Sequence, residues 1–137
     1  MVFERNTTLS TTVQKIMEKT DQAISIAQLM VKLAKEHLYP NRTTLYRMME
    51  KLQKKEIVTM IPLRSGVSYF ELVKKTKSRH DHHHHHFFCN QCERLFCLDQ
   101  CHVHSFDIDL TKLLPNPNFQ IRAHDFNLYG ICEGCTG

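Results

Sequence analysis

Long apolar runs are missing from this chain of 137 residues. The uninterrupted apolar stretches are only a few residues long, whereas a helix that crosses a bilayer needs about 20 apolar residues. The first five residues, MVFER, also lack the apolar core of a secretory signal. Because both features are absent, we expect no membrane span and predict a cytoplasmic protein.

Cysteine is absent from the first 88 residues, and all six cysteines follow. The cytoplasm keeps thiols reduced, so six cysteines point to metal or redox chemistry rather than to a disulfide framework. Charge is divided in the same way. Residues 1–86 carry 15 Lys and Arg against 8 Asp and Glu, and residues 87–137 carry 3 against 6. A basic part that suits a polyanion is thus joined to an acidic, cysteine-rich part, although chance asymmetry in a short chain would look the same.

The basic part is predicted to contain three helices. Apolar residues recur at helical spacing in residues 11–19. Ser25 and Gln28 form a capping box at the start of a second helix. This helix is expected to end before Pro40, because proline cannot continue a helix. Asn41 can cap a third helix.

The third helix carries an apolar stripe, and a predicted hairpin follows it. Its apolar positions repeat at i, i+3, i+4 and i+7: Leu45, Met48, Met49 and Leu52. Residues 57–61 and 67–72 read as strands around a turn at 64–66. Three helices and a hairpin indicate a winged helix-turn-helix, whose third helix offers its polar face to the major groove of DNA. The alternative is an ordinary solvated helix face. The candidate DNA contacts on this helix and on the wing are Arg42, Thr43, Thr44, Tyr46, Arg47, Lys51 and Arg64.

The acidic part contains two CxxC pairs separated by 39 residues, Cys89 with Cys92 and Cys132 with Cys135. Each pair can present two thiolates to one tetrahedral cation. Four thiolates complete a closed zinc site, which is typical of a structural metal. A thioredoxin-like redox pair is the alternative, but it requires only one CxxC, at the start of a helix.

A histidine run, residues 80–86 with one aspartate, leads directly into Phe87-Phe88-Cys89. As a bare tract it could bind metal adventitiously. If it is a strand, however, His83 and His85 point to one face and His84 and His86 to the other. Each face then offers a His-x-His pair for a divalent ion.

Four segments together resemble the ferric uptake regulator family, with its zinc- and peroxide-sensing branches. They are residues 44–47 (TLYR), residues 70–72 (FEL), the histidine-rich lead into Cys89-x-x-Cys92, and the ending from His124 to Cys135. The similarity covers residues from about 8 to the C-terminus. It implies an α+β fold, in which a winged helix-turn-helix domain precedes a small α/β, zinc-stabilised dimerisation domain. It also implies homodimers that bind palindromic operators in double-stranded DNA. The expected boundaries are 1–78, a hinge at 79–86, and 87–137.

The resemblance also implies two further metal sites. Carried over by position, a regulatory site takes Glu71, His84, His86 and Cys97, and an additional site takes His83, His85, His104 and His124. Two positions depart from the family pattern. Ala23 stands where many relatives have a histidine ligand, and Cys97 stands where iron and peroxide sensors have a carboxylate.

The donor set of the regulatory site indicates its metal. Two imidazoles, a thiolate and a carboxylate suit tetrahedral Zn²⁺ better than octahedral Fe²⁺ or Mn²⁺. The sequence therefore predicts a zinc-responsive repressor of metal homeostasis, with an iron- or peroxide-responsive regulator of the same family as the alternative. A zinc buffer or metal chaperone that binds no DNA is an alternative of another class. An enzyme is not expected, since the sequence contains neither HExxH nor the zinc deaminase pattern.

Overall fold

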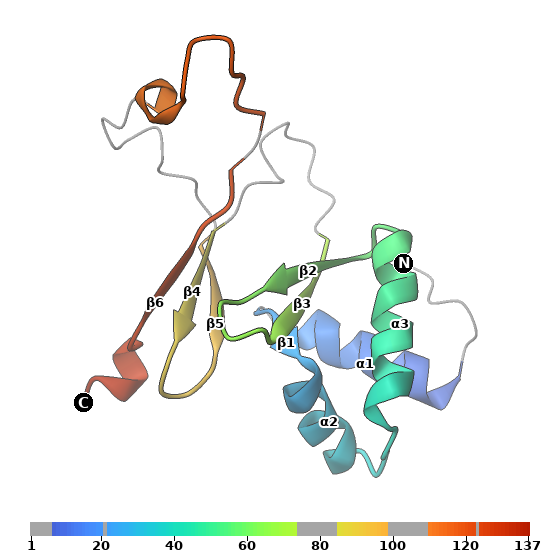
Figure 1. Ribbon diagram of the computed structural model, residues 1–137. Coiled ribbons are helices and arrows are strands. Elements are labelled where there is room, and N and C mark those ends of the chain that lie inside the picture. The colour runs from blue at the N-terminus through green and yellow to red at the C-terminus, as the bar shows by residue number, and fades with distance from the viewer. Residues whose placement is uncertain (1–6, 21, 74–84, 99–109, 123) are drawn as a thin grey trace.

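The computed structural model describes residues 7–20, 22–73, 85–98, 110–122 and 124–137. These residues form two three-stranded sheets that lie side by side, and three α-helices pack against the first sheet (Figure 1). We call residues 8–72 the winged-helix region and residues 85–137 the cysteine-rich region. The predicted α+β fold class is confirmed.

The winged-helix region contains α1 (Thr8–Lys19), α2 (Ile26–Lys35) and α3 (Arg42–Lys54). Its sheet has the order β1-β3-β2, with β1 (Ile24–Ser25), β2 (Val58–Pro62) and β3 (Ser68–Leu72) all antiparallel. The hairpin β2–β3 is the predicted wing, and its turn includes Gly66 at φ 86°, a conformation that glycine adopts without strain. Strand β1 was not predicted, because two residues are too few to show a period.

Side-chain caps determine where the helices begin. The predicted caps are present: Ser25 and Gln28 form a capping box on α2, and the Asn41 side chain accepts from the Thr44 N–H at 2.8 Å. Helix α1 begins three residues before the predicted range, because Thr7 caps it through Ser10. The core between the helices and the sheet is apolar, and its fully buried members are Val13, Leu29, Leu33, Leu45 and Met49.

The cysteine-rich region is built around strand β4 (His85–Cys89). Strand β5 (Leu95–Leu98) pairs with it antiparallel, and β6 (Asn127–Gly130) pairs with it parallel. The described part of this region also contains two short 3₁₀ helices, η1 (Leu110–Leu113) and η2 (Glu133–Cys135). Gly130 on β6 lies close to Phe87: a Cβ at this position would be 3.2 Å from the ring, which would then have to shift by a few tenths of an ångström.

The two regions meet at a small apolar cluster. Its buried members come from both sides: Ala23, Ile61, Leu63 and Tyr69 from the winged-helix region, and Leu95 from β5. An isolated antiparallel bridge joins Ala23 to Leu95. Ala23 is thus part of an apolar contact between the two regions. In the part of the chain that the structure describes, no helix is long and apolar enough to cross a membrane.

Candidate metal centres and nucleic-acid interface

The first candidate metal centre consists of the four CxxC cysteines. Cys89 ends β4, and its register partner on the parallel strand β6 is Gly130, two residues before Cys132. The pairing therefore brings together two CxxC turns that are distant in sequence. All four sulfurs, those of Cys89, Cys92, Cys132 and Cys135, lie within 4.8 Å of one another.

Hydrogen bonds already favour thiolates at two of these positions. Buried Cys89 Sγ accepts from the backbone N–H groups of Cys92 (3.5 Å) and Cys132 (3.4 Å), which lower its pKa to about 6. The Arg94 side chain lowers the pKa of Cys92. The pKa of Cys135 is instead raised to about 12, mainly by its hydrogen bond to Cys132. Four crowded sulfurs cannot all carry charge unaided, so such a group calls for a divalent cation.

The spacing of the sulfurs fits zinc. Zn–S bonds of about 2.3 Å in a tetrahedron place neighbouring sulfurs about 3.8 Å apart. Cys92 Sγ and Cys132 Sγ are 3.7 Å apart although they belong to different turns. A site closed by four thiolates leaves no open position for a reacting water, which is typical of a structural metal.

The second candidate centre lies between the two sheets. Glu71 on β3, His86 on β4 and Cys97 on β5 each direct one ligand atom to it, and the three atoms lie within 4.8 Å of one another. His86 and Cys97 are direct cross-strand partners, so their side chains share a face. His86 Nε2 lies 3.4 Å from Glu71 Oε2. The fourth predicted ligand, His84, lies outside the described residues.

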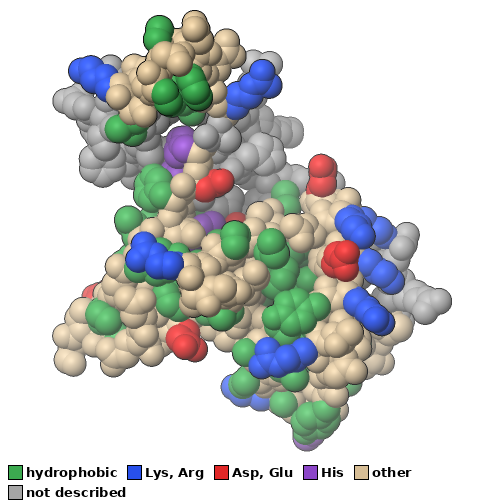
Figure 2. All heavy atoms as spheres, in the orientation of Figure 1, with side chains coloured by type: hydrophobic (Ala, Val, Ile, Leu, Met, Phe, Trp, Pro, Cys, Tyr) green, Lys and Arg blue, Asp and Glu red, His purple; other side chains and the backbone are tan. Residues whose placement is uncertain are grey.

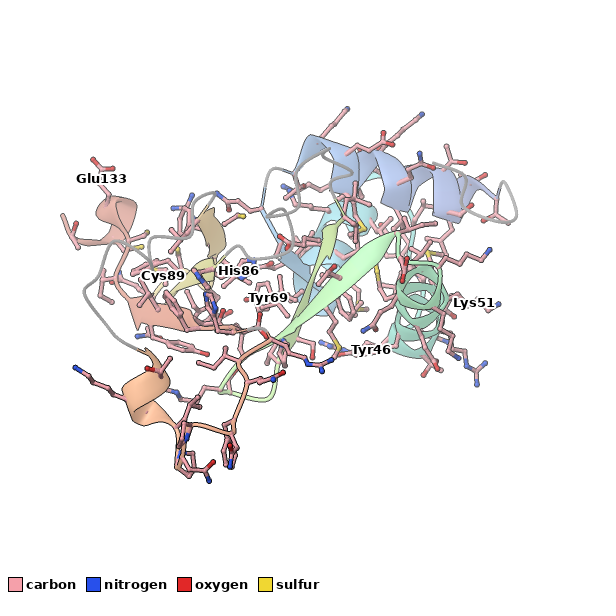
Figure 3. All side chains as sticks on the ribbon, turned by 90° about the horizontal axis from the view of Figure 1, so that it is seen from above. Tyr46, Lys51, Tyr69, His86, Cys89 and Glu133 are labelled. Carbon is pink, nitrogen blue, oxygen red and sulfur yellow. The ribbon has the colours of Figure 1, made fainter. Side chains whose placement is uncertain are left out.

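Alternation along the strands explains why these residues meet. Glu71 and Tyr69 are two residues apart on β3 and share a face, as do His86 and Phe88 on β4. Tyr69 packs edge-on against Phe88 with ring centroids 6.0 Å apart, directly beside the Glu71–His86 contact. The side chain of His86 is only 7% exposed. Figure 3 shows His86 and Tyr69 together at this junction, so the centre is continuous with the apolar contact between the regions.

The predicted additional site is only partly described. His85 points to the opposite face of β4 from His86 and stacks on Phe126, with centroids 3.7 Å apart. His124 lies beside it at 5.2 Å. The other two predicted ligands, His83 and His104, lie outside the described residues. Of the four predicted ligands of this site, the structure thus brings together His85 and His124.

The polar face of α3 is exposed as the sequence predicted. Leu45, Met49 and Leu52 are buried, and the candidate contacts Arg42, Thr43, Thr44, Tyr46, Arg47 and Lys51 are all exposed. Figure 2 shows several Lys and Arg side chains on this side of the molecule, and Figure 3 shows Tyr46 and Lys51 on α3, away from the metal centres. The arrangement can present positive charge and polar side chains to a nucleic acid.

The wing arginine is placed differently from the α3 residues. The Arg64 guanidinium lies 4.5 Å from the centre of the Tyr129 ring on β6, and the Arg64 backbone N–H donates to the Tyr129 hydroxyl at 3.1 Å. In this arrangement Arg64 faces the cysteine-rich region. The contact of Arg64 with DNA stays a prediction. It would require Arg64 either to reach DNA while it contacts Tyr129 or to leave Tyr129 when DNA binds.

Sequence reasoning missed the residues that support the first centre and join it to the winged-helix region. The carbonyl oxygen of Glu93, one residue after Cys92, accepts from the Tyr69 hydroxyl at 2.6 Å and from Gln28 Nε2 at 3.0 Å. Burial is the main cause that raises the pKa of Tyr69, so its hydroxyl stays protonated and can donate. Arg94 follows directly. The one signal in the sequence that could have identified Arg94 is its positive charge two residues after a CxxC pair.

Residues 4–129 match the sequence profile of the Ferric uptake regulator family. The chain belongs to this family. Members of the ferric uptake regulator family are metal-responsive transcriptional regulators and not enzymes.

Individual family members show the same likeness. The chain is 26% identical to the ferric uptake regulation protein of Campylobacter jejuni over 106 residues, which are 77% of this chain and 62% of that protein. The iron-containing structure of the Francisella tularensis ferric uptake regulator is 18% identical, with a TM-score of 0.73 over 100% of this chain and 98% of that one. The Helicobacter pylori ferric uptake regulator is 14% identical, with a TM-score of 0.70 over 97% of this chain and 83% of that one. These two structures share the fold.

Proposed function

We propose that this ferric uptake regulator family member is a metal-dependent DNA-binding repressor that acts as a homodimer and responds to zinc. The observation that carries the proposal is the convergence of Glu71, His86 and Cys97. Glu71 belongs to the winged-helix region and the other two belong to the cysteine-rich region. A metal held by all three would link the part that reads DNA to the part expected to dimerise.

The four-cysteine centre holds structural Zn²⁺ in this proposal. The support is its closed set of thiolate donors and the 3.7 Å spacing between sulfurs of different turns. The site clamps the end of β4 to the segment after β6. Because metal binding is also folding free energy, it would stabilise a region whose own apolar core is small.

The regulatory centre holds a second divalent ion, with Zn²⁺ preferred over Fe²⁺ and Mn²⁺. The Cys97 thiolate is a soft ligand, which favours zinc. The Francisella tularensis relative contains iron, so an iron- or peroxide-responsive regulator is the alternative. His84 would be the fourth ligand.

Metal would act on the angle between domains. We assign residues 1–78 to DNA binding, 79–86 to the hinge, whose last two residues begin strand β4, and 87–137 to dimerisation. In a dimer this angle determines whether both α3 helices can enter major grooves about 34 Å apart on a palindromic operator. A metal that binds the DNA-competent arrangement more tightly shifts the population toward it.

The additional site is proposed at His83, His85, His104 and His124. The support is the close approach of His85 and His124. The Helicobacter pylori regulator, which shares the fold, has three functional metal binding sites.

A binding experiment tests the proposed function. Duplexes would be selected from a random pool with the zinc-loaded protein, and affinity would then be measured by fluorescence anisotropy with chelated metal, Zn²⁺, Fe²⁺ or Mn²⁺. We expect tight, sequence-specific binding with Zn²⁺ and at least 100-fold weaker binding when the regulatory metal is chelated, a factor equal to about 2.7 kcal/mol. Protein that holds zinc but selects no duplex would instead support a zinc buffer, and selective activation by Fe²⁺ would support an iron regulator.

A further inference from the structure

Arg94 lies against the four-cysteine centre and contacts both of its turns. Its Nε–H donates to Cys92 Sγ at 3.3 Å, and its Nη2 donates to Cys132 Sγ at 3.7 Å. Cys92 belongs to the turn after β4, whereas Cys132 follows β6, so one guanidinium joins two segments that are 40 residues apart.

The rest of the residue holds this guanidinium in place. The Arg94 carbonyl accepts from the Cys89 N–H at 3.0 Å, which fixes its backbone beside a third cysteine. Its guanidinium also lies over the Phe96 ring, 5.3 Å from the ring centre. Backbone and side chain are therefore both positioned by the residues around the centre.

The positive charge of Arg94 lies beside a group that would be negatively charged when zinc is bound. Zn²⁺ with four thiolates carries a net charge of −2, and such thiolates are electron-rich and open to attack by protons and competing metals. An N–H donor withdraws electron density from sulfur, and the guanidinium offers two such donors in a rigid, planar fork. Lysine at this position would keep the charge on a flexible stem, without the rigid planar fork.

We propose that Arg94 is a positioning residue that retains zinc in the four-cysteine centre by donating to a thiolate of each turn. The inference rests on the proposed structural zinc. A zinc–cysteine bond must break before the metal leaves, and Arg94 holds the sulfurs of both turns in place while neutralising part of their charge. Residues that support metal ligands in this way typically contribute a factor of 10–100 to metal affinity.

Zinc transfer from the zinc-loaded full chain to a colorimetric chelator in excess tests the proposal. We expect Arg94→Gln to release zinc roughly 10-fold faster than the wild type. Arg94→Lys should fall between them, because it keeps the charge but lacks the rigid planar fork that offers one donor to each sulfur. Arg122→Gln is the matched control: it removes the same charge from an exposed arginine of the same region, and it should release zinc at the wild-type rate.

Cobalt provides a readout that a purely structural role would not change. With Co²⁺ in the centre, loss of N–H···S bonds raises the energy of the sulfur lone pairs and moves the sulfur-to-cobalt charge-transfer bands to longer wavelength. We expect this shift in Arg94→Gln and not in Arg122→Gln.

The possible results distinguish an error in the role of Arg94 from an error in the structural zinc site itself. If the wild type holds no zinc at the four cysteines, the structural site itself is wrong. If Arg94→Gln holds one zinc per chain but shows wild-type release and unshifted cobalt bands, only the role of Arg94 is overturned. If Arg94→Gln does not fold, Arg94→Lys decides, since wild-type release by that variant would show that the guanidinium fork is not needed and would overturn the role of Arg94.

Discussion

Cys132 has two contacts with the opposite CxxC turn, one through sulfur and one through its backbone. Its Sγ lies 3.7 Å from that of Cys92, and its N–H donates to Cys89 Sγ. Replacing the sulfur with a hydroxyl removes one zinc ligand and keeps the backbone contact. We therefore expect Cys132→Ser to lose about one zinc per chain and to unfold or monomerise the cysteine-rich region, as measured by metal analysis and light scattering. Cys97→Ser, matched in chemistry but outside this centre, should keep that zinc. A zinc-replete, dimeric Cys132→Ser protein would contradict the assignment.

Glu93 adopts a left-handed backbone conformation at φ 58°, which strains a residue with a Cβ. Its functional group is the backbone carbonyl, which glycine also has. We expect Glu93→Gly to raise the free energy of unfolding of the zinc-loaded protein by about 1 kcal/mol without changing its zinc content. Chemical denaturation checks this.

The control is Glu133→Gly, which removes the same charge from the 3₁₀ helix η2, where φ is not positive. It should destabilise the protein slightly, because glycine loses more backbone entropy there. Equal destabilisation by both variants would show that strain at Glu93 is not significant.

Helix α3 acts as a unit, because its buried apolar stripe fixes which side chains it exposes. Leu45 and Met49 are fully buried, so Arg47 between them points outward. We expect Arg47→Ala to weaken operator binding by at least 10-fold, or about 1.4 kcal/mol, while zinc content and melting temperature stay unchanged. If Arg47 contacts a phosphate, the salt dependence of binding should also fall by about one unit. Unchanged affinity at moderate salt would remove this residue from the interface.

Strand β3 and helix α2 hold the CxxC turn through a shared acceptor. The hydroxyl of buried Tyr69 and the amide of Gln28 both donate to the Glu93 carbonyl. Tyr69→Phe keeps the ring and its packing on Phe88 but removes one donor. We expect it to lower the free energy of unfolding by about 1 kcal/mol and to increase hydrogen exchange at the junction of the two regions.

Tyr39→Phe is the control, since Tyr39 is 78% exposed and should tolerate the loss of its hydroxyl. Combining Tyr69→Phe with Gln28→Ala should cost more than the sum of the two single changes, because the carbonyl then loses both donors. Simple additivity would show that the two hydrogen bonds do not act together.

The regulatory centre is the place where metal would control DNA binding, because its ligands come from both regions. Cys97 supplies its sulfur ligand from β5, and Glu71 supplies its carboxylate from β3. We expect Cys97→Ala to abolish zinc-dependent operator binding while it keeps the dimer and its structural zinc. Anisotropy titrations at saturating and chelated zinc measure this.

His124→Ala is the comparison variant, and it should reduce the response or the stability only in part, because His124 lies on the other face of β4 beside His85. If Cys97→Ala responds to zinc as the wild type does, the thiolate is not a regulatory ligand. The preference for zinc over iron would then lose its main chemical support.

The local features of this protein could be predicted from the amino-acid sequence. The caps at Ser25 and Asn41, the apolar stripe of α3 and the four cysteines were all readable, because each depends on residues within a few positions or on a fixed ligand spacing. Without the resemblance to a family, Glu71 and Cys97 would have been two among several possible ligands.

Which distant residues meet depends instead on how the strands pair and how the sheets pack. Strand register aligns His86 with Cys97, and the packing of one sheet against the other adds Glu71. The same packing placed Arg64 on Tyr129 and joined the Glu93 carbonyl to Tyr69. These contacts leave no periodic trace in the sequence, because they depend on how whole strands pair and on a backbone carbonyl that every residue has.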